Sequence, residues 1–363
     1  MNELEKARKT INEIDAQMAK LFEERMHASE VVAAYKKECG LSILDASREK
    51  EVIKNNSAYI ENSEICEYYV SFLKKVMELS RDYQTRLNEG MRVAYCGVEG
   101  AFAYIAAKKM FPQASLIPYP SFEEAHAAVE NGECDSCVLP IENSFAGDVG
   151  TVMDLIFSGS LYVNQVIDIP IVHNLLANEG ATLESIKEVV SHPQALSQCS
   201  AYISKRGYEQ RPYTNTALAA KLVKESGSCE IAAIASDETA SLYGLKILES
   251  SINESRNNTT RFASFSRVQN DSKSAKRKMG DHFILAFTVK NEAGALAKTL
   301  DIIGAHGFNM RNLRSRPMKE LMWSYYFYIE ADGNINTPDG KDMLRELGAT
   351  CDMLKLAGTY KTN

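Results

Sequence analysis

The sequence predicts a multidomain protein: an all-α helical N-terminal domain, a bilobal, doubly wound α/β domain, and a C-terminal α+β domain in the ferredoxin-like order βαββαβ. Three observations support this fold class. The first 88 residues contain no proline and carry a heptad pattern of apolar residues. From Met91, short apolar runs alternate with helical stretches. Beyond residue 280, the patterns follow the order strand, helix, strand, strand, helix, strand.

The N-terminal domain is predicted to consist of three helices. Apolar residues recur every seven positions from Leu4 to Met18, and the pattern continues to about Lys37. A helix of that length is roughly 50 Å long, which is more than a typical globular helix and predicts a bundle or an intertwined dimer. A short helix follows Asp45, and a third is expected over about residues 63–87.

The central domain is predicted to contain a mainly parallel sheet with helices on both faces. The helical stretches include about residues 101–110, 122–131, 194–206 and 216–226. A domain of this size has room for two lobes with a ligand cleft between them. We expect the domains to span residues 1–90, 91–268 and 281–363, with the polar, basic stretch 269–280 as a linker.

Composition and charge argue against several functional classes. The formal net charge of −7 does not favour nucleic acid or an anionic membrane as a partner, and the basic run KSAKRK is expected to be a solvated spacer. No apolar run approaches the ~18 residues of a membrane span, and the N-terminus has no apolar signal region. The protein is therefore expected in the cytoplasm, with no nucleic-acid or membrane partner.

The eight cysteines are expected to be reduced thiols, because the sequence shows no sign of export. Cys134 and Cys137 form a single CxxC pair. A structural zinc site needs two further ligands at suitable spacing, and neither a second CxxC pair nor a paired histidine motif is present. Packing at the start of an apolar strand is the better interpretation, and no metal is predicted.

Three cations lie on the apolar stripe of the first helix. Arg25 occupies a heptad position, and Arg8 and Lys36 fall on the same face. Burying an unpaired cation is costly, so three on one face indicate a bound anion. The alternative is that these long side chains reach into solvent. Ser80 and Gln84, one turn apart on the third helix, favour the anion site.

These spaced polar residues give the segment a resemblance to the all-helical chorismate mutases over about 85 residues. The matching positions are Arg8, Arg25, Lys36, Asp45, Arg48, Glu49, Ser80 and Gln84. The resemblance implies a unimolecular rearrangement of chorismate to prephenate. Such a reaction needs no nucleophile, metal or cofactor, only a held conformer and stabilised charge on the breaking ether oxygen.

The resemblance also implies a role for each residue type. Arg8 and Arg25 would clamp carboxylates, with a partner subunit as a possible source of Arg8. Lys36 and Gln84 would donate hydrogen bonds to the ether oxygen. The ring hydroxyl and the second carboxylate would be held by Glu49 and the neighbourhood of Asp45 and Arg48.

Four clusters in the central domain stand at the ends of predicted strands, where open α/β sheets bind ligands. They are the Gly97–Gly100 loop, PIENS (140–144), SHPQALSQC (191–199) and NNTTRF (257–262). A strand–helix turn would explain the glycine loop, and a helix start would explain SHPQ, where His192 is as well explained by structure as by catalysis. The hydroxyls and arginine of NTTRF suit an anion and a leaving oxygen.

Taken together, the clusters resemble prephenate dehydratase over about 175 residues, through GxxGAF, PIENSxxGxV, SHPQxLxQC, NTAxAA (215–220) and TRF. The resemblance implies that prephenate loses CO₂ and its ring hydroxyl, with Thr260 in catalysis. The implied cleft-lining residues are Glu142, Asn143, Ser144, Ser191, Gln198 and Arg261. One departure is that Val98 and Ala103 stand where the family has proline and serine.

The chemistry asks for a proton on the departing oxygen. Thr260 is a poor acid, so we expect it to donate a hydrogen bond within a network of polar groups. Glu142 would supply the proton if burial keeps its carboxyl protonated.

The C-terminal domain carries a candidate amino-acid site. GALAKTL (294–300) places small residues at a helix start, where backbone N–H groups can bind a carboxylate, although close packing of helix on sheet explains the motif equally well. With RSRP (314–317), the domain resembles the ACT regulatory domain of these dehydratases, which implies a phenylalanine site at a subunit interface. Its residues would be Gly294, Ala295, Leu296, Arg314, Ser315, Arg316 and Pro317. Arg314 replaces the family's Glu, which leaves the strength and sign of the phenylalanine effect open.

The expected protein is thus a bifunctional enzyme of phenylalanine biosynthesis with chorismate and prephenate as substrates, L-phenylalanine as effector and no cofactor. The long first helix and the ACT resemblance predict a homodimer or homotetramer. Two alternatives stay open: a dehydratase that prefers arogenate, and a non-catalytic ligand sensor. The intact polar set of the mutase and the TRF motif favour the enzyme over the sensor.

Overall fold

The computed structural model describes residues 2–255, 257–269, 282–318 and 324–361. The chain divides into two compact units, residues 1–91 and 92–363. Nearly all of the predicted linker 269–280 lies outside the described residues. None of the described helices combines the length and the apolar character that crossing a membrane requires.

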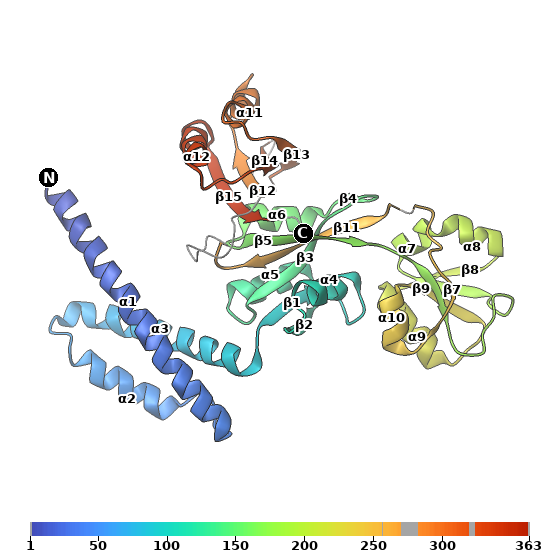
Figure 1. Cartoon of the computed structure of the whole chain (residues 1–363), viewed down its shortest axis with the longest axis horizontal. Helices are drawn as coiled ribbons and strands as arrows, with labels where there is room; N and C mark the ends of the chain where they lie inside the picture. Colours follow the sequence, from blue (N-terminus) through green and yellow to red (C-terminus); the bar gives the residue numbers. More distant parts are fainter. Residues whose placement is uncertain (1, 256, 270–281, 319–323, 362–363) are drawn as a thin grey trace. The chain divides into compact units, whose positions relative to one another are not determined.

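The first unit consists of three helices, as predicted (Figure 1). They are α1 (Glu3–Glu38), α2 (Ala46–Ser57) and α3 (Ser63–Glu89). α1 begins with a capping box, in which Asn2 and Glu5 each accept a hydrogen bond from the other's backbone N–H. Asp45 begins α2 by accepting a hydrogen bond from the Arg48 N–H at 3.0 Å. Side-chain caps therefore fix where both helices start.

The N-terminal half of α1 presents an uncovered apolar face. Near its other end, α1 packs on α3 through the buried residues Ser29 and Ala33. Five apolar side chains toward the N-terminus are 43 to 62% exposed: Leu4, Ile11, Ile14, Met18 and Leu21. The heptad pattern predicts that this face is buried, and the described part of the chain leaves it open. A face of this length is suited to a second helix.

The first lobe of the second unit is a sheet with helices packed on it (Figure 1). Its strands are β1 (Arg92–Cys96), β2 (Ser115–Tyr119), β3 (Ser136–Asn143), β4 (Gly147–Asp148), β5 (Tyr162–Pro170) and β11 (Thr259–Ser266). Its helices are α4 (Phe102–Met110), α5 (Phe122–Glu130) and α6 (Gly150–Ser158). Cys134 and Cys137 are fully buried in its apolar core. This burial confirms the packing interpretation of the CxxC pair.

The second lobe has its own sheet and its own core. Its strands are β6 (Asn174–Ala177), β7 (Glu188–Ser191), β8 (Glu209–Pro212), β9 (Ile231–Ala235) and β10 (Lys246–Glu249), in the order β10-β6-β9-β7-β8. Its helices are α7 (Pro193–Gln198), α8 (Ser200–Arg206), α9 (Thr216–Ser226) and α10 (Asp237–Tyr243). Leu175, Val189 and Ile234 lie at the centre of a core separate from that of the first lobe.

The prediction of a mainly parallel sheet is wrong, because both sheets are mixed. β1 runs parallel to β2 and β3, but β11 is antiparallel to both β3 and β5. In the second lobe, β7 is parallel to β8 and β9, whereas β6 is antiparallel to β9 and β10. The chain leaves the first lobe after β5 and returns as β11 only after the second lobe. β11 therefore lies between β3 and β5 and runs antiparallel to both.

The C-terminal segment, residues 282–361, alternates strands and helices in the predicted order. Its elements are β12 (His282–Thr288), α11 (Ala295–Ala305), β13 (Met310–Pro317), β14 (Tyr325–Asp332), α12 (Pro338–Thr350) and β15 (Met353–Tyr360). Its strands, in the order β13-β14-β12-β15, extend the sheet of the first lobe, because Gly358 of β15 pairs with Val163 of β5. A Cβ at position 358 would lie 2.1 Å from the Val163 carbonyl oxygen, so this approach requires glycine.

Candidate active sites

In the helical unit, Arg25 on α1 contacts Ser80 on α3. The Arg25 guanidinium donates a hydrogen bond to Ser80 Oγ, and Ser29 Oγ lies 3.3 Å from the same oxygen. Ser80 is only 4% exposed. Burial lowers the pKa of Arg25, although a guanidinium stays charged in proteins. One predicted cation therefore lies at the buried junction of two helices.

Gln84 lies one turn further along α3 and is also buried. Among the described residues, its side-chain Oε1 has no hydrogen-bond partner. Leaving a buried polar atom without a partner costs about 1–3 kcal/mol. The position therefore calls for a bound molecule or a group from another chain.

Lys36 and Glu49 are half-buried and have partners in neighbouring segments. Lys36 Nζ donates to the Ile43 carbonyl at 2.5 Å. The Glu49 carboxylate accepts a hydrogen bond from Arg81 of α3. Sequence reasoning missed Arg81, although its position directly after the predicted site residue Ser80 could have marked it as a candidate. The ion pair joins α2 to α3 beside the Arg25–Ser80 contact.

Asp45 and Arg48 lie exposed at the start of α2. The hydrogen bond from Ser47 Oγ, at 2.6 Å, is the main cause of a lowered pKa of Asp45, followed by that from the Arg48 N–H. The Arg48 side chain donates to Glu51 at 2.7 Å.

Arg8 is exposed and lies far from the other predicted residues of its own helix. Seventeen positions separate it from Arg25, a distance of about 25 Å along an α-helix. One chain therefore cannot bring these two arginines to the same small ligand.

A cleft in the second unit lies between the two lobes. Its lining comes from the loop after β1, the start of α4, β3 and β11, and from segments 192–198 and 214–216 of the second lobe. Three predicted residues line it: Asn143, Gln198 and Thr260. His192 and His173 line it too. His192 also begins α7, where its Nδ1 accepts a hydrogen bond from the Gln194 N–H at 3.2 Å.

Asn143 is held so that it must donate to Thr260. Its Oδ1 accepts hydrogen bonds from the backbone N–H groups of Phe145 at 3.0 Å and Ala146 at 2.8 Å. Backbone N–H groups can only donate, so the remaining amide atom, Nδ2, is the donor. Nδ2 lies 2.8 Å from Thr260 Oγ1 and 2.9 Å from Asn258 Oδ1. Thr260 Oγ1 therefore accepts, and its own proton is left to donate.

Gln198 continues this network to a histidine that sequence reasoning missed. Gln198 Oε1 lies 2.9 Å from Asn258 Nδ2 and 2.9 Å from His173 Nε2. His173 is 2% exposed, and burial is the main cause of the lowered pKa of its imidazole. Asn258 lies within the NNTTRF cluster, whereas His173 stands alone in an apolar run that gave no signal of chemistry.

α4 and α9 are among the helices that begin at the cleft. α4 follows Ala101 and has no side-chain cap, and α9 begins at Asn215, which accepts a hydrogen bond from the Leu218 N–H at 2.7 Å. Ala101, Ala103 and Asn215 all line the cleft. The first N–H groups of a helix carry partial positive charge, so these two starts favour an anion.

Ser191 and Ser144 bind backbone groups elsewhere. Ser191 is fully buried and donates to the Ile234 carbonyl at 2.6 Å. Ser144 donates to the Asn257 carbonyl at 2.9 Å and accepts from the Thr259 N–H at 3.0 Å. Both hydroxyls support the walls of the cleft, and neither residue is part of the lining described above.

Arg261 is bound by the C-terminal segment. Its guanidinium donates to both carboxylate oxygens of Glu330, at 3.0 and 3.1 Å, and to the Tyr360 hydroxyl oxygen at 3.2 Å. Tyr360 in turn donates to Glu330. Burial alone would lower the pKa of Arg261, but the hydrogen bonds and charge of Glu330 outweigh it and the pKa is raised. The fixed guanidinium ties β11 to β14 and β15.

Glu142 also contacts the C-terminal segment. Its carboxylate lies 2.6 Å from Arg314 Nη2 and 3.7 Å from Arg261 Nη1. Arg314 also pairs with Asp148. Arg314, which replaces the family's Glu, thus contacts Glu142 of the PIENS motif and Asp148 of β4.

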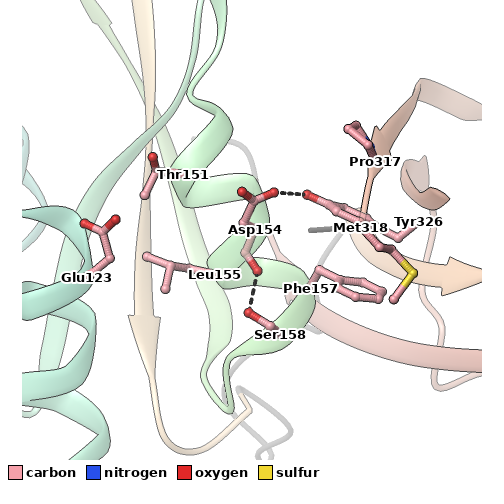
Figure 2. A pocket seen from close by; sticks show the side chains of 9 residues that line it. All are labelled: Glu123, Thr151, Asp154, Leu155, Phe157, Ser158, Pro317, Met318 and Tyr326. Carbon is pink, nitrogen blue, oxygen red and sulfur yellow. Dashed lines mark hydrogen bonds between the residues drawn. The ribbon is translucent and has the colours of Figure 1, made fainter. Parts of the chain in front are cut away.

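Arg316 contacts the first lobe through α6. It donates to Asp154 at 3.1 Å, and the Tyr326 hydroxyl donates to the same carboxylate at 2.8 Å. Figure 2 shows this carboxylate in a pocket beside Phe157, whose ring stacks on that of Tyr326 with the centroids 4.2 Å apart. Pro317 lines the same pocket, and Ser315 is exposed.

The other predicted regulatory residues begin α11. Gly294 has a φ of +84°, a left-handed conformation that favours glycine, and Ala295 is the first helical residue. Leu296 packs against the core of the C-terminal segment. The two halves of the predicted phenylalanine site thus lie on different elements, and the arginines of one half are engaged with the first lobe.

Comparison with known proteins identifies two families along the chain. The family model for "Chorismate mutase type II" matches residues 7–85, and that for "Prephenate dehydratase" matches residues 93–270. The first match covers the helical unit with the Arg25–Ser80 contact. The second covers both lobes and the cleft.

Two relatives illustrate the range of similarity. A bifunctional chorismate mutase/prephenate dehydratase of Buchnera aphidicola is 31% identical over 97% of this chain and 95% of its own length. A chloroplastic arogenate dehydratase/prephenate dehydratase of Arabidopsis thaliana is also 31% identical, over 74% of this chain and 72% of its own.

Two solved structures resemble the chain with a TM-score of 0.68 each. One is a prephenate dehydratase from Arthrobacter aurescens in complex with L-Phe, which is 27% identical over 75% of this chain and 90% of that chain. The other is GqqA, described as a novel type of quorum quenching acylase, which is 29% identical over 75% of this chain and 98% of that chain.

Proposed function

This chain belongs to the bifunctional chorismate mutase/prephenate dehydratases, and we propose which part of it carries out each reaction. The chain rearranges chorismate to prephenate and then removes CO₂ and the ring hydroxyl to give phenylpyruvate, in the biosynthesis of phenylalanine. We assign the first reaction to residues 1–90 and the second to residues 91–268. Residues 281–363 form a regulatory ACT domain of ferredoxin-like fold, which the order of elements in the C-terminal segment supports.

The mutase reaction depends on positioning and on donors to the ether oxygen. Arg25 offers a planar pair of donors to a carboxylate, and its contact with Ser80 fixes where that pair lies. Lys36 and Gln84 donate to the ether oxygen. The buried, unpartnered amide atom of Gln84 supports this role, because the oxygen and nitrogen of an amide are interchangeable by a simple flip.

The mutase site is completed by a second copy of the chain. The separation of about 25 Å between Arg8 and Arg25 supports this, because one ligand can use both only if Arg8 comes from another subunit. The exposed apolar face of α1 gives that subunit a surface to bind. The enzyme is therefore at least a homodimer, with a homotetramer as the larger alternative.

The dehydratase reaction takes place in the cleft of the second unit. The electrons of the bond to the departing CO₂ enter the ring, the carbon–oxygen bond to the ring hydroxyl breaks, and the oxygen leaves as water after protonation. The observation that carries this assignment is the Thr260 hydroxyl, which accepts from Asn143 and so keeps its proton for a group in the cleft. A hydrogen bond from Thr260 stabilises the charge that develops on the departing oxygen. The starts of α4 and α9 favour the dianionic substrate.

Phenylalanine regulates the dehydratase through β11. Thr260 lines the cleft, whereas its neighbour Arg261 is bound by Glu330 and Tyr360 of the C-terminal segment. Successive residues of a strand face opposite sides, so a shift of the C-terminal segment moves the strand that carries Thr260. The L-Phe complex of the Arthrobacter aurescens prephenate dehydratase supports phenylalanine as the effector.

We also infer a cytoplasmic location. The eight cysteines are all free thiols, as expected of a protein in a reducing compartment. Neither reaction calls for a cofactor or a metal, because a unimolecular rearrangement needs only positioning and the elimination needs only a proton for the departing oxygen.

The test is to incubate the purified chain with chorismate alone and to identify the products over time, with and without phenylalanine. Phenylpyruvate formed without a second enzyme is the expected result, and a change in its rate on adding phenylalanine establishes the regulation. Prephenate that accumulates without further reaction would contradict the dehydratase assignment. Parallel incubation with arogenate then separates an arogenate-preferring dehydratase, which forms phenylalanine, from a ligand sensor, which forms nothing.

A further inference from the structure

His173 is a buried polar residue of the cleft for which the mechanism so far has no use. It lies directly before β6, is 2% exposed and lines the cleft. Its Nε2 is bound to Gln198, but among the described residues its Nδ1 has no hydrogen-bond partner. A buried imidazole nitrogen without a partner is rare, so its partner is expected to be a bound molecule.

The hydrogen bonds around His173 fix which of its nitrogens carries the proton. Because Asn143 Nδ2 donates to Asn258 Oδ1, the other amide atom of Asn258 is the donor, and it donates to Gln198 Oε1. The atom of Gln198 that faces His173 is therefore an acceptor, so His173 Nε2 carries a proton and donates it.

The remaining nitrogen, Nδ1, is then an acceptor in the neutral ring. Burial lowers the pKa of this imidazole and favours the neutral form. This assignment of donors and acceptors starts from the backbone N–H groups of Phe145 and Ala146, which can only donate. Two residues that line the cleft therefore have preset roles, Thr260 as a donor and His173, through its buried Nδ1, as an acceptor.

We propose that His173 Nδ1 accepts a hydrogen bond from the ring hydroxyl of prephenate. The inference rests on the proposed dehydratase function of the cleft. The carboxylates of prephenate are ionised at neutral pH, so its ring hydroxyl is the only hydrogen-bond donor that the substrate offers. The unpartnered acceptor of His173 therefore selects the ring hydroxyl, which is the group that leaves in the reaction.

The two contacts act on the same hydroxyl in different ways. His173 binds its proton and so orients its oxygen, and Thr260 donates to that oxygen as the carbon–oxygen bond breaks. The product phenylpyruvate has no ring hydroxyl and makes neither contact. His173 therefore contributes to the recognition of substrate over product and does not supply the proton.

A matched pair of substitutions separates the two nitrogens of His173. In His173→Gln, the side-chain amide reaches the position of Nε2 and keeps the bond to Gln198, but no acceptor stands where Nδ1 was. In His173→Asn, the shorter amide places an oxygen near Nδ1 and loses the bond to Gln198. We expect kcat/KM for prephenate to fall about 10- to 100-fold in His173→Gln, as for the loss of one hydrogen bond in a buried site, and to fall less in His173→Asn.

Three further measurements make the test decisive. The inhibition constant of phenylpyruvate should stay within about 2-fold of wild type in His173→Gln, because a contact to the ring hydroxyl is absent from the product complex. Mutase turnover of the same samples and their thermal unfolding report on folding. Equal losses in both variants, or a wild-type kcat/KM in His173→Gln, would overturn the proposal. Absence of dehydratase activity in the wild-type chain would instead overturn the proposed function of the cleft.

Discussion

The helical unit and the cleft of the second unit organise their polar residues in different ways. In the cleft, Asn143, Asn258, Gln198 and Thr260 form one continuous network whose directions are set by backbone N–H groups. In the helical unit, Arg25 has a partner, Gln84 has an unpartnered buried atom among the described residues, and Arg8 lies far along an exposed helix. The proposed dehydratase site therefore draws on one chain, whereas the proposed mutase site needs a second.

This difference follows from the two folds. A cleft between two lobes encloses its ligand from several elements of one chain, so every donor can be held by a neighbour in advance. In the helical unit, α1 has 36 residues, and α2 and α3 leave the apolar face of its N-terminal half exposed. The uncovered part becomes useful only when another copy packs on it. Substitutions should therefore act within one chain in the cleft and across chains in the helical unit.

The largest effect is expected at Thr260. Replacing Thr260 by Ala removes a hydroxyl that accepts from Asn143 and keeps its own proton for the cleft, and dehydratase turnover should fall by ~10²–10⁴-fold. Mutase turnover of the same sample should stay at the wild-type level, because the helical unit is untouched. Rates of phenylpyruvate formation from prephenate and of chorismate loss measure the two activities separately.

Thr260→Ser is the matched control, because it keeps the hydroxyl and the contact with Asn143. It should retain most of the dehydratase turnover. Parallel loss of both activities in Thr260→Ala would point to a folding defect and would remove the support for Thr260 as the donor.

Lys36 is expected to give the next largest effect, confined to the mutase. Lys36→Ala removes a donor to the ether oxygen, and mutase turnover should fall by ~10²–10³-fold, as for the loss of one transition-state donor. The neighbouring variant Lys37→Ala is the control, because Lys37 Nζ donates to the Asn88 carbonyl at 3.1 Å in an exposed position. Chorismate consumption measures the effect, and unchanged turnover in Lys36→Ala would contradict the assignment.

A smaller effect is expected from the contact that ties the cleft to the C-terminal segment. Glu330→Gln removes the carboxylate that accepts two hydrogen bonds from the Arg261 guanidinium, and the free energy of unfolding of the second unit should fall by about 1–3 kcal/mol. Thermal unfolding at neutral pH measures this loss. Glu230→Gln, which removes an exposed ion pair with Lys187, is the control and should change little.

The same contact predicts a pH dependence. Burial alone would raise the pKa of Glu330, but the hydrogen bonds from Arg261 and Tyr360 outweigh it, and the pKa in the folded protein is lowered. The stabilisation is therefore fully present above the pKa of an unfolded Glu, about 4.3, and is lost as the pH falls through the lower folded value. The difference in stability between wild type and Glu330→Gln should shrink on acidification, and a difference that grows would contradict this sign.

The sequence predicted the elements well and their pairing less well. Heptads, capping residues such as Asp45 and short apolar runs are local signals, and the helices predicted by range lie within a few residues of their expected limits, although the stretch 194–206 is divided into α7 and α8. The antiparallel return of β11 depends on the path of the chain between two lobes, and no local pattern records that path.

The site residues show the same limit. Motifs led to Asn143, Gln198 and Thr260, which the structure joins in one network. Motifs alone do not tell a residue that faces the cleft from its neighbour on the strand, and Arg261 binds the C-terminal segment. His173 was missed because a single histidine in an apolar run gains meaning only from the partners that folding supplies.

Subunit mixing tests the contrast between the two sites most directly. A heterodimer of an Arg8→Ala chain and a Lys36→Ala chain, isolated through two different affinity tags, has one site with both residues intact if Arg8 comes from the partner. Mutase turnover should then recover to about half that of the wild-type dimer, since one of its two sites is restored. A heterodimer of Arg25→Ala and Lys36→Ala is the matched control, because both residues belong to the same chain's site and neither site is repaired. No recovery in the first pair would mean that the helical unit builds its site within a single chain, as the cleft does. Recovery in the control would mean that Arg25 and Lys36 of one site come from different chains, which would also contradict the proposed division.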